Sequence, residues 1–300
     1  MQDKRGKPSR LLGMELTWKK DEVILTQRTL IETMQQTHLP NISDQIGNKT
    51  SLPSNMTNYE PMAEDEGDEP TEQKPYQSLI GGLLFVGRMT RPEISLHINL
   101  LGRRAIAPSQ RNLKAALKVL GYLYSTRYEG LTLRKPIKKD QLEVVVYADA
   151  SYGGEGARSQ TGALLTLGNQ PIGWYSRRQD IVSLSITEAE YIADCEGAKD
   201  AAWIRQFLQE LHITTLTPVL KTDSEGAYNL AQTSKFLWRS RHIEHRYHYL
   251  RQQCQQGLLT IKTIPGKENL ADILTKLLPM SEISAWKVNW LSSTGRDTSI

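Results

Sequence analysis

Hydrophobic and polar positions follow different patterns in three stretches of the chain. Residues 11–38 contain two short β-rich runs around a charged turn and then apolar residues at helical spacing, which predicts a hairpin and a helix. Residues 41–75 are polar and acidic and show no periodicity, whereas residues 76–128 carry apolar residues on helical faces. The pattern therefore predicts a small hairpin unit, a disordered linker and a helical segment, in that order.

Residues 141–278 alternate between β-rich and helical patterns. The β-rich runs cover residues 142–148, 163–167, 171–175, 219–222 and 259–264. The helical patterns begin near Thr187 and continue at residues 226–232, 242–255 and 269–278. In the first helix, one apolar face is predicted for Ile204, Phe207, Leu208 and Leu211. This order predicts an α/β fold with a mixed five-stranded sheet, which begins as an antiparallel meander and has flanking helices.

Composition narrows the class of protein. A chain of 300 residues is long enough for two domains with buried cores. No apolar run approaches the ~20 residues of a membrane span, and residues 1–10 lack the apolar stretch of a signal peptide, so we expect an intracellular protein without a membrane partner. Cys195 and Cys254 are too few for a disulfide framework or a zinc site.

The net charge of +4 conceals an uneven distribution. Residues 76–135 contain ten Lys and Arg against two acidic residues, a net charge of +8, whereas residues 41–75 carry −6. Such asymmetry favours a polyanion as the partner of the basic segment, the alternative being a solvated basic face.

Four acidic residues are predicted where strands lead into helices: Asp149, Glu190, Asp223 and Asp272. Functional groups of α/β sheets gather at the carboxyl ends of strands, and clustered carboxylates repel one another unless hard cations bind between them. Mg²⁺ prefers oxygen ligands, and two such ions can activate water and stabilise the leaving oxygen of a phosphoryl displacement.

Each acid also has a structural interpretation. Thr187 and Glu190 fit a helix capping box, which on spacing alone is the better explanation of Glu190, and Glu188 is its rival as the functional acid. Asp149 and Asp223 could each cap a helix or close a turn after a strand. A lone Asp272 would most simply be a surface acid.

Several motifs occur in the order found in one family. They read Tyr-Ala-Asp-Ala-Ser-Tyr-Gly at 147–153, Ser-Gln-Thr-Gly at 159–162, Thr-Glu-Ala-Glu-Tyr-Ile-Ala at 187–193, Thr-Asp-Ser at 222–224, Arg-His-Ile-Glu at 241–244 and Asn-Leu-Ala-Asp-Ile-Leu-Thr-Lys at 269–276. Together they resemble the ribonuclease H (RNase H) domain of Ty1/copia-type retrotransposon Pol polyproteins. The upstream segments at 76–85 and 90–94, and those at 12–15 and 25–27, resemble the connection and the end of the reverse transcriptase of these elements.

The resemblance implies a division of the chain. It gives a reverse transcriptase remnant at 1–40, an acidic linker at 41–75, a basic connection or thumb-like segment at 76–135, an RNase H domain at 140–280 and a tail at 281–300. The catalytic Tyr-x-Asp-Asp motif of the polymerase does not occur in this sequence, so we expect no polymerase activity. The loop at 265–269 holds no histidine where larger cellular RNases H have one, and Lys267 or Glu268 would have to replace it.

The resemblance also implies a site and its partners. The four acids would hold two Mg²⁺ ions, with Mn²⁺ as the alternative, and would cleave the RNA strand of an RNA–DNA hybrid during reverse transcription. Nucleic-acid contacts are expected at Arg103, Arg104, Arg111, Lys114, Arg241, His242, Arg246 and His248. Further partners would be a reverse transcriptase core or other retrotransposon proteins, in a cytoplasmic virus-like particle or the nucleus.

Three alternatives stay open at this point. The chain could be a catalytically silent remnant that binds nucleic acid without cutting it, or a nuclease or integrase-like enzyme of the same fold class. His242, His245 and His248, three residues apart, could bind a metal, but such positions spread around a helix, so a basic face is the better interpretation.

Overall fold

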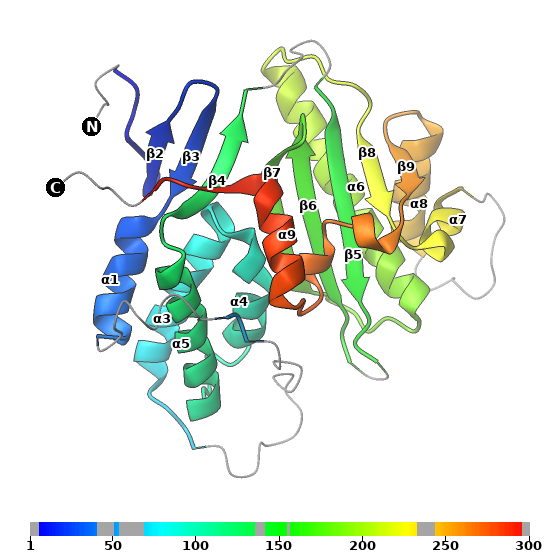
Figure 1. Cartoon of the computed structure of the whole chain (residues 1–300). Helices are drawn as coiled ribbons and strands as arrows, with labels where there is room; N and C mark the ends of the chain where they lie inside the picture. The colour runs from blue at the N-terminus through cyan, green and yellow to red at the C-terminus, as the bar shows by residue number, and fades with distance from the viewer. Residues whose placement is uncertain are drawn as a thin grey trace. The chain divides into compact units, whose positions relative to one another are not determined.

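The computed structural model describes residues 6–40, 51–53, 69–135, 142–154, 157–232 and 244–295. The chain divides into two compact units, whose elements are labelled in Figure 1. The first, called here the discontinuous unit, combines Met1–Lys135 with Leu277–Ile300, and the second, the central unit, is Pro136–Lys276.

A five-stranded antiparallel sheet forms one layer of the discontinuous unit. Its strands are β1 (Arg10–Leu11), β2 (Met14–Trp18), β3 (Glu22–Thr26), β4 (Glu129–Arg134) and β10 (Leu291–Ser293), in that spatial order. The register of β2 and β3 confirms the predicted hairpin, in which Trp18 lies opposite Val23. Because β4 pairs with β3, the predicted segments at 1–40 and 76–135 belong to one unit.

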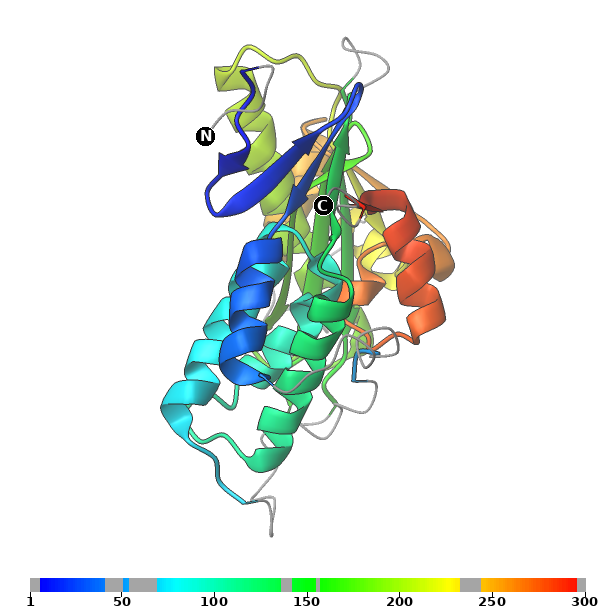
Figure 2. The ribbon, with the colours of Figure 1, turned by 60° about the vertical axis from the view of Figure 1, so that its left-hand side comes forward.

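Helices supply the rest of the core of this unit. They are α1 (Arg28–His38), α3 (Gln73–Met89), the short 3₁₀ helix η2 (Pro92–Ile94), α4 (Ser95–Gly102), α5 (Gln110–Ser125) and α9 (Met280–Trp290). Figure 2 shows α1, α3 and α5 side by side. Tyr76, Leu79 and Leu83 are fully buried on one face of α3, as the helical periodicity predicts.

The C-terminal segment differs from the prediction. Residues 281–300 were expected to be a tail, but residues 280–293 form α9 and β10, and Leu291 of β10 pairs with Leu131 of β4. Ile283, Trp286 and Trp290 are buried at spacings of three and four residues, so burial of this apolar face explains the helix.

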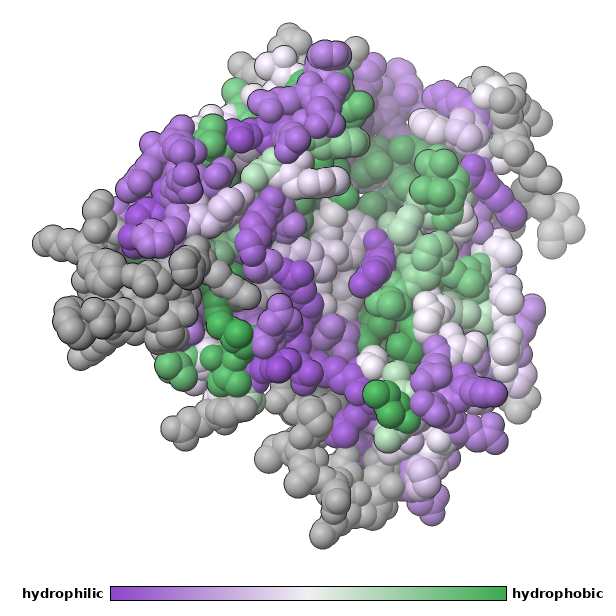
Figure 3. Space-filling view, turned by 180° about the vertical axis from the view of Figure 1, so that it is seen from behind, coloured by the Kyte–Doolittle hydropathy of each residue, from purple (hydrophilic) through white to green (hydrophobic). Residues whose placement is uncertain are grey.

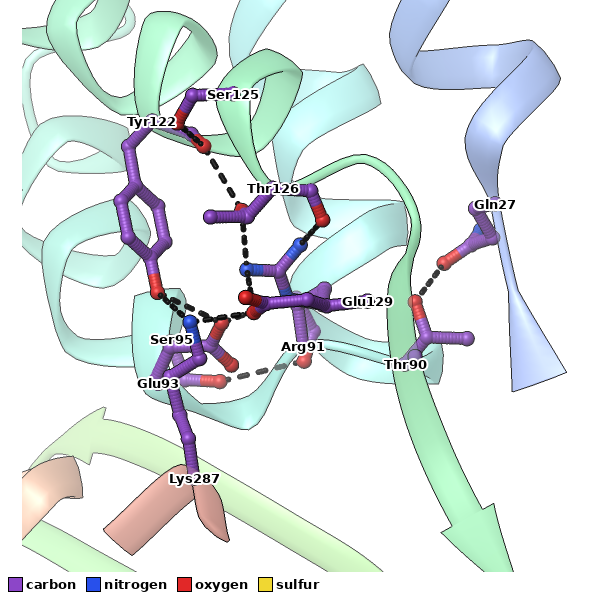
Figure 4. A network of polar contacts seen from close by, with 12 residues as sticks. Gln27, Thr90, Arg91, Glu93, Ser95, Tyr122, Ser125, Thr126, Glu129 and Lys287 are labelled. Carbon is purple, nitrogen blue, oxygen red and sulfur yellow. Dashed lines mark hydrogen bonds and ion pairs between the residues drawn. The ribbon is translucent and has the colours of Figure 1, made fainter. Parts of the chain in front are cut away.

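A buried polar network connects four elements of the discontinuous unit (Figure 4). Arg91 is fully buried, and its Nε donates to Glu93 Oε1 at 2.6 Å while its Nη2 donates to the Thr126 hydroxyl at 2.7 Å. Lys287 of α9 forms an ion pair with Glu129 and lies 3.1 Å from the Tyr122 hydroxyl. Burial alone would lower the pKa of Arg91, but the neighbouring carboxylates outweigh it and raise that pKa, so the guanidinium stays charged.

His97 of α4 is the buried histidine of this unit, and its Nε2 lies 3.0 Å from the carbonyl oxygen of Pro53. Burial lowers the pKa of His97 to about 4, against a weaker opposite effect of that carbonyl. The folded protein therefore resists a proton that the unfolded chain accepts below pH 6.5. We expect the unit to lose about 3 kcal/mol of stability between pH 7 and pH 4 through this residue.

Hydrogen exchange of α3 to α5 at a series of pH values measures this loss. His97→Gln keeps a donor for Pro53 but cannot titrate, so it should flatten the pH dependence. His212→Asn, at an exposed histidine, should leave it unchanged. An identical pH dependence in wild type and His97→Gln would contradict the expectation.

The central unit contains a mixed five-stranded sheet. Its strands are β5 (Val144–Ser151), β6 (Gln160–Leu167), β7 (Gln170–Arg178), β8 (Val219–Thr222) and β9 (Thr260–Thr263), in the spatial order β7-β6-β5-β8-β9. The β5–β6 and β6–β7 pairs are antiparallel, and the β5–β8 and β8–β9 pairs are parallel. The helices are α6 (Ile186–Glu210), α7 (Glu225–Gln232) and α8 (Glu244–Gln255). The predicted RNase H-like fold is confirmed.

The long helix α6 packs on β5 and β6, but its predicted apolar face is only partly buried. Ile204 and Leu208 face the core, whereas Phe207 and Leu211 are exposed, and the exposed Trp203 ring stacks on Phe207 at 5.6 Å. Figure 3 shows, on one face of the molecule, hydrophobic patches between hydrophilic side chains.

The predicted closing helix at 269–278 is wrong. The chain there forms one 3₁₀ turn, η5 (Asp272–Leu274), and a second one, η4 (Gly266–Glu268), precedes it. A Cβ at Gly162 of β6 would lie 2.7 Å from side-chain atoms of Leu274 and Thr275, so this segment packs directly on the sheet. Close packing on β6 and hydrogen bonds of the Asn269 side chain replace the helix.

Of the predicted linker at 41–75, residues 41–50 and 54–68 lie outside the described residues.

Candidate active site

Three carboxylates meet at one edge of the central sheet. Asp149 lies on β5, and Asp223 follows β8, which runs parallel to β5. Glu190 lies on α6, which packs on β5. One carboxylate oxygen of each residue lies within 4.8 Å of those of the other two. The fold thus brings together acids that are up to 74 positions apart in the sequence.

Glu190 is oriented by the sheet and does not cap the helix. Its Oε2 accepts the backbone N–H of Ala150 at 3.0 Å. The helix is capped two residues earlier than predicted: the Ser185 hydroxyl accepts the N–H of Glu188 at 3.1 Å, and the Glu188 carboxylate accepts the N–H of Leu184 at 2.8 Å. The capping-box interpretation of Thr187 and Glu190 is therefore wrong, and Glu188, the rival acid, is occupied at the cap.

Asp272 lies beside this cluster and is joined to it by a lysine. The Lys276 ammonium is 2.8 Å from Asp272 Oδ1 and 3.3 Å from Asp149 Oδ1. The Thr275 hydroxyl also donates to Asp149. Among the described residues, the group of carboxylates close enough to share one ion contains Asp149, Glu190 and Asp223 but not Asp272.

The local electrostatics disfavour this arrangement of acids without a cation. Burial raises the pKa of Asp149 to about 7, with Lys276 and Thr275 acting against it and Asp272 and Asp223 adding to it. Burial and then the Asp149 charge raise the pKa of Glu190 to about 9. Around neutral pH these buried acids compete for protons unless a cation compensates them.

The donor set fits a hard divalent cation. It consists of carboxylate oxygens from three elements, and the described residues of the cluster include no sulfur or imidazole ligand. Asn269 supports it, because its Nδ2 donates to the Ala148 carbonyl at 2.9 Å and to Asp223 Oδ1 at 3.1 Å. These hydrogen bonds hold the Asp223 carboxylate in one orientation.

Sequence reasoning missed two residues at this site. Lys276 lies in the motif at 269–276, but the motif alone predicts no role for it. Asp194 is completely buried one helical turn after Glu190, and burial raises its pKa well above the ordinary value, against the Thr222 hydroxyl. Its position four residues after Glu190 was the available signal, since such residues share a helix face.

The predicted nucleic-acid residues are distributed over both units. Arg103 and Arg104 follow α4, and Arg111 and Lys114 are exposed or partly exposed in the first turns of α5. His248 is exposed on α8. Arg246 lies on the same helix without a described side chain, and Arg241 and His242 lie outside the described residues, which leaves the histidine metal site untested.

Comparison with known proteins gives homologues over most of the chain. No family model matches. The Pol polyprotein of transposon TNT 1-94 from Nicotiana tabacum is 30% identical over 94% of this chain, and that of transposon RE1 from Arabidopsis thaliana is 34% identical over 71%. The Ty1-ER2 Gag-Pol polyprotein of Saccharomyces cerevisiae is 27% identical over 94%. The chain spans 21%, 14% and 16% of the lengths of these three relatives.

Solved structures with similar chains are RNase H domains. The N-terminal RNase H domain of rv2228c from Mycobacterium tuberculosis aligns with 49% of this chain and 97% of its own at 16% identity, with a TM-score of 0.35. LC11-RNase H1 in complex with an RNA/DNA hybrid aligns with 44% of this chain and 92% of its own at 17% identity, with a TM-score of 0.35.

Among the helices that the structure describes, none is long and apolar enough to cross a membrane. The strand order and directions of β5 to β9 give the fold of the central unit, and the sequence comparisons give its relatives. The homologues of this chain are Pol polyproteins of Ty1/copia-type retrotransposons, and its central unit has an RNase H-like fold.

Proposed function

We propose that the central unit is a ribonuclease H that hydrolyses the RNA strand of RNA–DNA hybrids during retrotransposon reverse transcription. The observation that carries the proposal is the convergence of Asp149, Glu190 and Asp223 on the RNase H-like sheet. The homology to Pol polyproteins supplies a context in which such hybrids form.

Asp149, Glu190, Asp223 and Asp272 would hold two Mg²⁺ ions, or Mn²⁺ in their place. Bound there, the ions supply an activated water and stabilise the leaving oxygen of the phosphodiester. Asp149 would contribute to both ion positions, because its carboxylate lies in the cluster with Glu190 and Asp223 and also contacts the Lys276 ammonium that contacts Asp272. Ala150 and Asn269 keep Glu190 and Asp223 aimed at the cluster, so the ligands are held in place before substrate arrives.

The hybrid would be recognised by its shape, its phosphates and the ribose 2′-hydroxyls of the RNA strand. Basic residues would position it without reading sequence, both on the segment 76–135 and around α8. The remaining partners would be a reverse transcriptase core or other retrotransposon proteins, within a virus-like particle or the nucleus.

Cleavage of labelled substrates tests the proposal. With Mg²⁺, the wild-type protein should cut the RNA of a hybrid and spare duplex DNA and single-stranded RNA, and Asp223→Asn should cut nothing. Asp180→Asn, at an exposed acid outside the cluster, is the matched control and should cut normally. Hybrid binding without cutting by the wild type would favour the silent remnant instead.

Charge-neutralising substitutions on α5 test the basic segment. We expect Arg111→Gln with Lys114→Gln to weaken hybrid binding equally for all sequences, and to reduce the slope of log K against log salt by about two, since two phosphate contacts are lost. Fluorescence anisotropy at several salt concentrations gives the slope. The control variant Lys19→Gln with Lys20→Gln, at two exposed lysines, should leave the slope unchanged. An unaltered slope in the α5 variant would show that Arg111 and Lys114 do not contact the hybrid.

A further inference from the structure

We propose that the Lys276 ammonium occupies the place of the second metal ion in the metal-free protein, so that an ion enters between Asp149 and Asp272 only by displacing it. The inference rests on the proposed function, because it takes the four acids to be the metal ligands. It adds a residue that helps to set the order in which the two ion positions fill.

The geometry places the ammonium between the two carboxylates. Lys276 Nζ is 2.8 Å from Asp272 Oδ1 and 3.3 Å from Asp149 Oδ1. The contact with Asp272 has the length of a charge-assisted hydrogen bond, and the contact with Asp149 is a longer ion pair; the two oxygens come from residues that are 123 positions apart. The ammonium thus does what a cation would do at this position: it compensates two carboxylates that would otherwise repel each other.

The local backbone structure holds Asp272 and Lys276 close together. The N–H of Lys276 donates to the carbonyl oxygen of Asp272 at 2.8 Å, and the N–H of Thr275 donates to the same oxygen at 3.1 Å. This turn follows η5 and fixes Lys276 beside Asp272. Whenever Asp272 is in position to bind an ion, Lys276 therefore carries a positive charge within reach of the same oxygens.

Burial differs between the two ends of this contact. The side chain of Asp149 is completely buried, whereas that of Lys276 is 41% exposed. The lysine reaches in from the solvent side on a flexible four-carbon stem, and it can swing out without moving the sheet. Asp149 cannot move away, so the exchange must occur through the lysine.

The two ion positions consequently differ in availability. Among the described residues, Lys276 contacts Asp149, but no lysine ammonium forms an ion pair with Glu190 or Asp223, so the position among these three acids should fill first. Binding of the second ion is weakened by the free energy of the two Lys276 contacts that it breaks. Phosphate oxygens of a bound hybrid would offset this cost, because Asp149 and Asp272 alone supply few of the oxygen ligands that Mg²⁺ takes.

Metal titration of the variant Lys276→Met tests the exchange, with no hybrid present. Isothermal titration calorimetry with Mg²⁺, and Mn²⁺ binding followed by electron paramagnetic resonance, should give a second half-saturation concentration about threefold to tenfold lower than in wild type, since no ammonium is displaced. The metal-free variant should melt at a lower temperature and gain more from Mg²⁺. Lys276→Arg should behave like wild type, and the control Lys262→Met, at an exposed lysine of β9, should do so too.

A measurement on the wild type keeps the test valid if the variant does not fold. In nuclear magnetic resonance spectra, the ¹⁵Nζ signal of Lys276 should show an ammonium protected from exchange in the metal-free protein. The signal should shift when more than one equivalent of Mg²⁺ is added. Three outcomes would overturn the exchange: a Lys276 signal that does not change with Mg²⁺, equal half-saturation concentrations in wild type and Lys276→Met, or no metal binding by either protein.

The two proposals fail in different ways. If the wild type cuts hybrids but Lys276→Met binds metal as the wild type does, the exchange is wrong and the ribonuclease stands. If Lys276→Met shows the expected metal affinity while no hybrid is cut, the exchange stands and the ribonuclease is wrong.

Discussion

Replacing Glu190 by Gln should have opposite effects on activity and on stability. Cleavage of a hybrid should fall about a hundredfold or more, because the proposed metal site would lose a ligand and with it several kcal/mol of transition-state stabilisation. The metal-free protein should become more stable by about 3 kcal/mol at pH 7. Gln keeps an oxygen for the Ala150 N–H but requires no proton and carries no charge.

The sign follows from the pKa of Glu190, which burial and Asp149 raise from 4.5 to about 9. Between these values the folded protein holds a proton that the unfolded chain has released, so the stability of metal-free wild type falls as pH rises. Glu190→Gln should lack this fall, and Mg²⁺ should restore the wild type but not the variant. Denaturant unfolding from pH 4 to pH 9, with and without Mg²⁺, measures the pH dependence of stability and the effect of Mg²⁺ on it.

Glu196→Gln is the matched control on the same helix. Burial alone would raise the pKa of Glu196, but Lys199 and Arg177 hold that pKa below its usual value. Removal of the Glu196 carboxylate should therefore cause a small loss of stability at pH values above 5 and should leave cleavage intact. If Glu190→Gln instead destabilised the metal-free protein at pH 7, Glu190 would be ionised there and the electrostatic account of the cluster would be wrong.

Arg91→Met should destabilise the discontinuous unit by about 3–5 kcal/mol. The substitution leaves the Glu93 carboxylate buried without its cation and removes the donors to Thr126. Hydrogen exchange of peptides from α3 to α5 should report the loss, with the central unit unaffected. This separation is expected because Arg91 and its partners Glu93, Thr126 and Glu129 all lie in the discontinuous unit.

The double variant Arg91→Met with Glu93→Met distinguishes burial of an unpaired charge from loss of packing. It should recover most of the stability, since an apolar pair of similar volume often replaces a buried ion pair without cost. Lys19→Met, which breaks an ion pair with side chains 48% and 22% exposed, should cost less than about 1 kcal/mol. A double variant as unstable as the single one would assign the effect to packing.

The sequence predicts the sheet of the central unit well, because strands such as β8 are short apolar runs with clear ends. It places Asp149 and Asp223 correctly for the same reason: each stands at or just beyond a run of β-branched and aliphatic residues. It fails at residues 269–278, where apolar spacing suggests a helix. Packing of that segment on Gly162 is a tertiary contact that no local pattern contains.

The site is predicted less completely than the fold. Spacing alone assigned Glu190 to a cap, and only the structure shows Ser185 and Glu188 at that cap. The role of Lys276 depends on a contact with Asp149 across the sheet, which periodicity cannot reveal. Likewise, α9 and β10 carried a visible apolar spacing at Ile283, Trp286 and Trp290, but their partner strand β4 lies far upstream in the sequence.

The pairing of β10 with β4 has a consequence for the order of events on the ribosome. Leu291 pairs with Leu131, so the outermost strand of the first sheet emerges from the ribosome only after the whole central unit has emerged. The central unit, whose strands and helices are contiguous in the chain, can fold as a nascent domain while the earlier unit still lacks its last strand and helix. Folding of the central unit also shortens the chain that must close between β4 and β10, which lowers the entropic cost of that closure. A truncated chain that ends before residue 280 should therefore carry a protease-resistant central unit next to an unfinished, protease-sensitive sheet.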